Sequence, residues 1–133
     1  MEKLSRPSIL TGVTYKIKCP NNSGELSNVY LIINNDEQGR AFEIFIRCDD
    51  PTLFEHITAV TLLVTDMLRR GISLLDIADT LGDVHSPNTA HMIPGTHIMC
   101  PSLYARIAHT FRLHVKNSVD VPKDDLEVVD EVL

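Results

Sequence analysis

Three runs of alternating residues near the N-terminus constrain the fold more than any other feature. They lie at 13–18, 29–34 and 42–47, and apolar residues, most of them β-branched or aromatic, recur in them at every second position. A period of two is typical of a β-strand with one buried face. Two short polar stretches that end in glycine, 20–24 and 35–39, join the runs. Such connections link antiparallel neighbours, so the sequence predicts a three-stranded meander.

Three helices are expected after the strands. The first begins at Asp50-Pro51, a capping residue followed by a first-turn proline, and its apolar positions recur at steps of three and four until Gly71. A short second helix begins after Ser73, and a third covers about 101–116. The sequence therefore predicts an α+β domain, a three-stranded antiparallel meander packed against three helices.

The loop before the last helix is a candidate metal site. It covers 83–99, and loops of that length in compact domains are usually functional or disordered. It contains His85, His91 and His97, and Cys100 stands at its end. Three imidazoles and a thiolate have the number and chemistry of ligands that a closed zinc site requires. Zinc is thus a candidate cofactor, and the alternative is a solvated polar loop.

Cys100 is also a candidate redox residue. If Pro101 is the first helical residue, Cys100 is the N-cap, where the helix dipole favours a thiolate. The alternative is a small buried residue at a helix start. An intramolecular dithiol would require Cys19 or Cys48 to approach through the fold. Three cysteines, an odd number, fit a reducing cytoplasm better than a disulfide framework.

Other catalytic or membrane features are not visible in the sequence. There is no nucleophile elbow, zinc-protease motif or phosphate-binding glycine loop, so no autonomous enzymatic activity is expected. We expect Glu43 to pair across the sheet with Lys16 or Lys18 rather than act as a general base. The longest apolar stretch, 57–68, is interrupted by polar residues and is shorter than the roughly 20 residues of a membrane span. The N-terminus lacks the apolar core of a signal peptide, which favours a cytoplasmic location.

The sheet face turned away from the helices is a candidate partner-binding surface. If the apolar set faces the helices, then Tyr30, Ile32 and Phe45 face away, among Lys16 and Arg47. Aromatic residues framed by bases could dock a protein or stacked nucleic-acid bases. The alternatives are that a second subunit, or the chain's own C-terminal tail, covers this face.

Charge divides the chain into a body and a tail. Residues 1–118 hold 11 basic and 12 acidic side chains, whereas 119–133 hold 1 and 6. A near-neutral body argues against a nucleic-acid binder, which needs a surplus of Lys and Arg. The acidic tail also carries apolar residues, including Leu126 and Leu133, that could dock into a groove rimmed by bases. The alternative is a disordered tail that binds no groove and only makes the chain more soluble.

Five segments of the chain follow one another in a recognisable order: Arg6-Pro7, 12–17, 39–46, 68–72 and 100–108. Together they resemble the TSCPD-type domain of vitamin B12-dependent (class II) ribonucleotide reductases. That domain also occurs as short free-standing proteins, and the resemblance covers about 6–115. In the last segment Cys100 and Pro101 match the family's Ser-Cys-Pro-Asp motif, while Met99 and Ser102 replace its outer residues.

The resemblance implies a free-standing accessory or regulatory module in deoxyribonucleotide synthesis. Such a module would act by binding a protein partner, for example a reductase subunit or a second copy of itself. The chain is too short to contain the reductase's catalytic barrel, so no nucleotide-reducing site is implied. Two alternatives stay open: a redox component that passes electrons to a reductase through Cys100, and a nucleic-acid or host-protein binder that uses the outward sheet residues.

Overall fold

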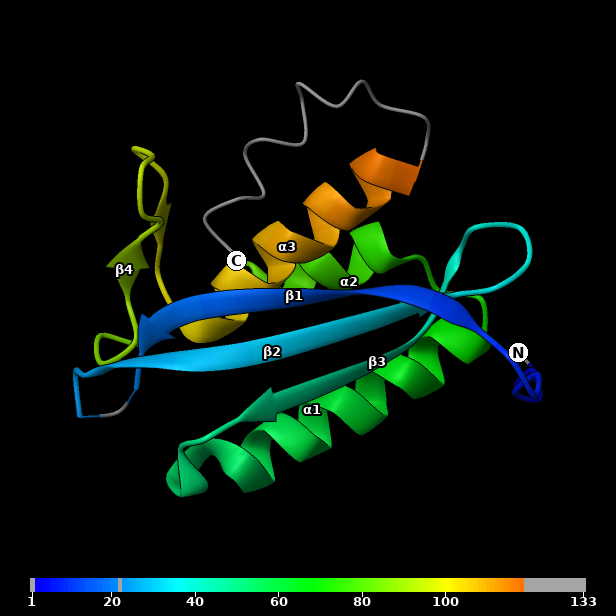
Figure 1. Cartoon of the computed structure of the whole chain (residues 1–133), viewed down its shortest axis with the longest axis horizontal. Helices are drawn as coiled ribbons and strands as arrows, with labels where there is room; N and C mark the ends of the chain where they lie inside the picture. The colour runs from blue at the N-terminus through cyan, green and yellow to red at the C-terminus, as the bar shows by residue number, and fades with distance from the viewer. Residues whose placement is uncertain (1, 22, 119–133) are drawn as a thin grey trace.

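An antiparallel meander forms the centre of the structure. The computed structural model describes residues 2–21 and 23–118. Strands β1 (Thr11–Pro20), β2 (Leu26–Asn35) and β3 (Ala41–Cys48) are arranged in the order β1-β2-β3 (Figure 1). The predicted three-stranded sheet is confirmed, and each strand extends beyond its alternating run.

Glycine and polar side chains build the β2–β3 turn locally. Gly39 has a positive φ of 81°, a conformation that costs glycine little. The Asp36 carboxylate accepts hydrogen bonds from the backbone N–H groups of Gln38 (2.9 Å) and Arg40 (3.0 Å). The chain reversal is therefore encoded by adjacent residues.

The predicted helices are present. They are α1 (Pro51–Arg69), α2 (Leu74–Leu81) and α3 (Leu103–Ser118). Asp50 caps α1 by accepting from the backbone N–H of Thr52 at 2.9 Å, and Ser73 caps α2. Helices α2 and α3 pack together on one face of the sheet, whereas α1 runs beside β3 (Figure 1).

Helix α1 closes the β3 edge of the sheet. The Thr65 hydroxyl accepts from the backbone N–H of Ile44 at 3.1 Å and donates to the Ile44 carbonyl at 3.2 Å. One side chain thus satisfies two backbone groups that would otherwise face outward from an edge strand. The core lies between the inward sheet face and the helices. Its buried members include Tyr15, Ile17, Leu31, Ile33, Ile44, Ile57, Val64, Leu68, Ile77, Ile107 and Phe111.

The region before α3 differs from the prediction. The loop contains a two-stranded hairpin, β4 (His91–Met92) and β5 (Met99–Cys100). Cys100 lies in β5, so its predicted N-cap position is wrong. Ser102 takes that role instead, because its hydroxyl oxygen accepts from the Ala105 N–H at 2.9 Å and is a better acceptor than a thiol.

The acidic tail, 119–133, lies outside the described residues, together with its predicted partner-binding residues Leu126 and Leu133. Among the described residues, no helix combines the length and the apolar character needed to cross a membrane.

Candidate functional site

The five predicted partner-binding residues of the sheet lie together in two cross-strand rows. In one row Tyr30 of β2 is flanked by Lys16 of β1 and Arg47 of β3. In the next row Ile32 is flanked by Thr14 and Phe45. Side chains directly opposite one another on a sheet are in contact distance. We call the surface formed by these six residues the outer sheet face.

The outer sheet face carries no helix in the described part of the chain (Figure 1). Phe45 is 50% exposed and Arg47 is exposed, while Tyr30 and Ile32 are half-buried. Tyr30, Phe45 and Arg47 belong to residue types that are enriched in protein interfaces.

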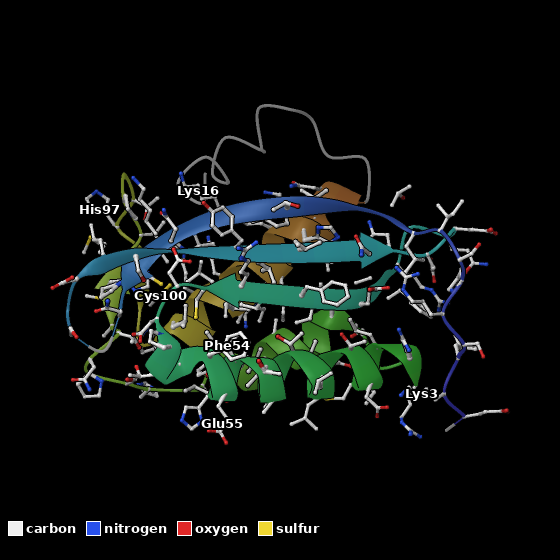
Figure 2. All side chains as sticks on the ribbon, turned by 60° about the horizontal axis from the view of Figure 1, so that its bottom comes forward. Lys3, Lys16, Phe54, Glu55, His97 and Cys100 are labelled. Carbon is white, nitrogen blue, oxygen red and sulfur yellow. The ribbon has the colours of Figure 1, made fainter. Side chains whose placement is uncertain are left out.

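The apolar surface continues onto α1 across a groove beside β3. The groove encloses about 390 Å³, and Phe45, Phe54 and Leu62 are among its lining residues. Figure 2 shows Phe54 on α1 near the β3 side of the helix, with Lys16 on the far strand. Sequence reasoning missed Phe54 and Leu62. The available signal was their spacing of two helical turns with Thr58 between them, on the face of α1 next to its buried stripe.

An ion pair between a buried carboxylate and an exposed arginine stands at the groove. Glu43 is 1% exposed, and its Oε1 accepts from Arg6 Nε at 2.6 Å. The expected pairing of Glu43 with a lysine of β1 is wrong, because Asn34 lies opposite Glu43. Glu43 Oε2 has no hydrogen-bond partner among the described residues and remains an acceptor at the groove.

The three cysteines converge, and burial acts against thiolate formation at two of them, Cys19 and Cys48. Burial raises the pKa of Cys19 to about 11 against the attraction of Arg106, and charges on Cys48 and Cys100 would raise it further. Burial also raises the pKa of Cys48. Strand β2 separates Cys19 from Cys48, and two strand spacings, about 9.5 Å, exceed the roughly 7 Å that a disulfide can bridge. Cys100 is only 3% exposed.

The predicted zinc ligands are not assembled in the structure. His91 donates from Nδ1 to the Thr89 carbonyl (2.9 Å), and its Nε2 faces Nη1 of the fully buried Arg106 at 3.0 Å. His85 and His97 are exposed. In residues 2–21 and 23–118, no group of three or more His, Cys, Asp or Glu side chains could hold a metal ion. Zinc at this loop stays a prediction, and its binding would require His91 to release a present partner.

Burial lowers the pKa of His91 below its ordinary value, against the effect of its bond to Thr89, and the charge of Arg106 lowers it further. A neutral His91 is the form that can accept a hydrogen bond from the Arg106 guanidinium. The structure therefore gives His91 a supporting role for a buried arginine of α3.

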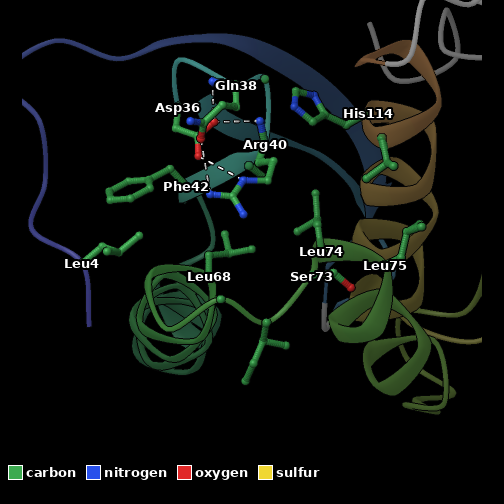
Figure 3. Close-up of a pocket in the computed structure, with 15 residues that line it drawn as sticks. Leu4, Asp36, Gln38, Arg40, Phe42, Leu68, Ser73, Leu74, Leu75 and His114 are labelled. Carbon is green, nitrogen blue, oxygen red and sulfur yellow. Dashed lines mark hydrogen bonds and ion pairs between the residues drawn. The ribbon is translucent and has the colours of Figure 1, made fainter. Parts of the chain in front are cut away.

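A second cavity lies under the β2–β3 turn, at the end of the sheet away from the β4–β5 hairpin (Figure 1). It encloses about 400 Å³ between that turn and the three helices, and Figure 3 shows Arg40 and Asp36 above its apolar lining. The apolar lining includes Leu4, Phe42, Leu68, Ile72, Leu74 and Val115.

A buried polar chain supports the wall of this cavity. His114 Nε2 lies 2.9 Å from Asn35 Oδ1, and His114 Nδ1 lies 2.7 Å from the Tyr15 hydroxyl. Because the amide oxygen can only accept, Nε2 carries the proton and Nδ1 accepts from Tyr15. Burial lowers the pKa of His114 to about 4 and raises that of Tyr15 to about 12. Both groups are therefore neutral at physiological pH.

Comparison with known proteins identifies the family. The sequence profile of the TSCPD domain matches residues 3–114, nearly the whole chain. No significant match was found among curated proteins or among solved structures. The profile match confirms the resemblance drawn from the five segments. The chain therefore belongs to the TSCPD domain family, which suggests a relation to ribonucleotide reductase.

Proposed function

We propose that this chain is an accessory module of ribonucleotide reduction that acts by binding a protein through the outer sheet face. The observation that carries the proposal is the row Lys16–Tyr30–Arg47 beside the row Thr14–Ile32–Phe45, on a sheet face without a helix in the described residues. The family relation supports a ribonucleotide reductase subunit as the partner.

The residue types of the outer sheet face favour a protein partner. Tyrosine, phenylalanine and arginine are enriched in the few positions that contribute most of the binding free energy of interfaces. The exposed Phe54 and Leu62 of α1 extend the same surface, so a partner could contact both sheet and helix. Stacked bases could also occupy the aromatic positions, but the body of the chain lacks the positive surplus that such binding requires.

The proposal is tested by titrating the full chain against the purified large subunit of ribonucleotide reductase from the same source. The variant Phe45→Glu places a charge in the centre of the outer sheet face, and we expect it to weaken binding by about tenfold or more. Met92→Glu is the matched control, because Met92 is also a strand residue and is also 50% exposed.

Isothermal titration calorimetry supplies the dissociation constants, and circular dichroism establishes that both variants are folded. Wild-type binding that is lost in Phe45→Glu and retained in Met92→Glu supports the proposal. Equal dissociation constants for the two variants would remove the outer sheet face as the docking surface. No binding of the wild-type chain would remove this subunit as the partner.

A further inference from the structure

The outer sheet face carries an unbalanced positive charge. The charged side chains at outward positions of the three strands are Lys16, Lys18, Arg47 and Glu43. Glu43 is buried and is neutralised by Arg6 at 2.6 Å. Three cations therefore remain beside the half-buried aromatic and aliphatic side chains, on a body whose net charge is close to neutral.

The 15 residues that follow α3 have the complementary composition. Residues 119–133 contain six acidic side chains and one basic side chain, and their apolar residues are interspersed with the acids. Segments of this kind can place apolar side chains on an apolar surface while their carboxylates meet a basic rim.

The end of α3 places this segment within reach of the outer sheet face. His114 contacts Asn35, and the Asn117 side chain hydrogen-bonds to Tyr15, so the last turns of α3 lie behind β1. Lys16 follows Tyr15 on β1 and points to the opposite face, and β1 is an edge strand. A chain leaving α3 has to pass only this one edge.

The available length is sufficient for that path. Fifteen extended residues span up to about 50 Å. Crossing the outer sheet face from β1 to β3 requires two strand spacings, about 10 Å, which leaves most of the length for passing the β1 edge. Attachment to the same chain also gives the segment a high effective concentration at this face, on the order of millimolar.

We propose that residues 119–133 dock across the outer sheet face of their own chain, with carboxylates against Lys16, Lys18 and Arg47. The apolar residues of the segment then cover Tyr30, Ile32 and Phe45. The inference rests on the proposed function, because it assigns the regulation of the same docking surface. The segment is an intramolecular competitor of the protein partner, which has to displace it.

Zero-length cross-linking of the full chain tests the contact directly. A carbodiimide joins lysine amines to carboxylates that touch them, and peptide mapping by mass spectrometry locates the joined pairs. We expect links from Lys16 or Lys18 to acidic residues within 120–131 in the monomer fraction. Lys3 and Asp66, whose Nζ and Oδ1 are 3.0 Å apart, supply the internal positive control.

Variants establish whether the outer sheet face holds the segment. We expect Phe45→Glu to lower the yield of these links several-fold, because the new carboxylate repels an acidic segment and removes its apolar contact. Met92→Glu lies on the β4–β5 hairpin and should leave the yield unchanged. A yield that is equal in both variants would overturn the proposed site.

The remaining outcomes separate this inference from the proposed function. A Lys3–Asp66 link without links to 120–131 overturns the docking of the segment. If the links occur only in a dimer fraction, the segment of one copy contacts another copy. That result also overturns the proposed intramolecular docking. If these links are absent while Phe45→Glu still loses the reductase subunit, the proposed function stands. If the links are present and the reductase subunit does not bind, the partner assignment fails instead.

Discussion

At the scale of single residues, His114 is the side chain whose protonation is changed most clearly by folding. It is buried on α3 between Tyr15 and Asn35, and its pKa falls to about 4 from an ordinary value near 6.5. The unfolded chain therefore binds a proton at this residue at pH values where the folded chain does not. Its contribution to stability is complete above about pH 6.5 and is lost as the pH falls toward 4.

The first prediction concerns this pH dependence. Between pH 7 and pH 5, we expect protonation of His114 in the unfolded state to lower the free energy of unfolding by roughly 2 kcal/mol. The variant His114→Gln removes the titrating group and should lose that part of the slope. Urea unfolding of both proteins at several pH values measures the difference. The other five histidines are common to both proteins, so a difference between the two pH profiles comes from residue 114. Parallel pH profiles would contradict the assignment of this pH dependence to His114.

Thiol reactivity is the second prediction at this scale. Because burial raises the pKa of Cys19 and Cys48 and covers Cys100, alkylation of the native protein at pH 7 should be slow at all three. Cys48, which is only half-buried, should react first. In urea all three should react at the rate of an ordinary thiol. Rapid native labelling of Cys100, located by peptide mapping, would instead support electron transfer through this residue.

At the scale of secondary-structure elements, the contact between α1 and β3 depends on one hydroxyl. We expect Thr65→Val to destabilise the fold by about 1–3 kcal/mol, because it leaves the N–H and carbonyl of Ile44 without their partner. Thr65→Ser retains the hydroxyl and is the matched control. Chemical denaturation measures both values, and a Thr65→Val variant that is at least as stable as Thr65→Ser would contradict the role of the hydroxyl.

The elements that the sequence predicted are those determined by adjacent residues. The strands follow from alternation, and the starts of α1 and α2 follow from Asp50 and Ser73. The start of α3 was placed two residues early, because a distant group helps to decide it. The Thr89 hydroxyl accepts from the Leu103 N–H at 3.1 Å, across 14 residues of chain. The β4–β5 hairpin was missed because two residues per strand are too few to establish a period.

At the scale of the whole molecule, the candidate site was only partly predictable. The alternating pattern identified the outward residues of the sheet, because successive side chains of a strand point to opposite faces of the sheet. It could not place Phe54 and Leu62 beside Phe45, because the position of a helix relative to a sheet depends on tertiary packing. The Arg6–Glu43 pair, which joins residues 37 apart, was missed for the same reason.

The acidic tail yields a prediction at this scale. Deleting residues 119–133 should lower the melting temperature by no more than a few degrees, because the buried cluster of the described residues already joins the three long strands to the three helices. The deletion should also tighten binding to the reductase subunit severalfold, because a competing segment is removed. Thermal unfolding and calorimetric titration measure the two effects. A large fall in melting temperature would make the tail part of the folded core.

The closure of β3 by Thr65 has a consequence for assembly. A sheet with two open edges can add chains at both sides and grow into a fibre. This sheet has β1 at one end of its order and α1 along the other. In the described part of the chain, two copies that paired through β1 would each keep only the β3 edge of this sheet, where Thr65 of α1 already binds the backbone of Ile44. We therefore expect pairing through the edges of the three-stranded sheet to stop at a dimer, so the helix that contributes to the core also opposes polymerisation.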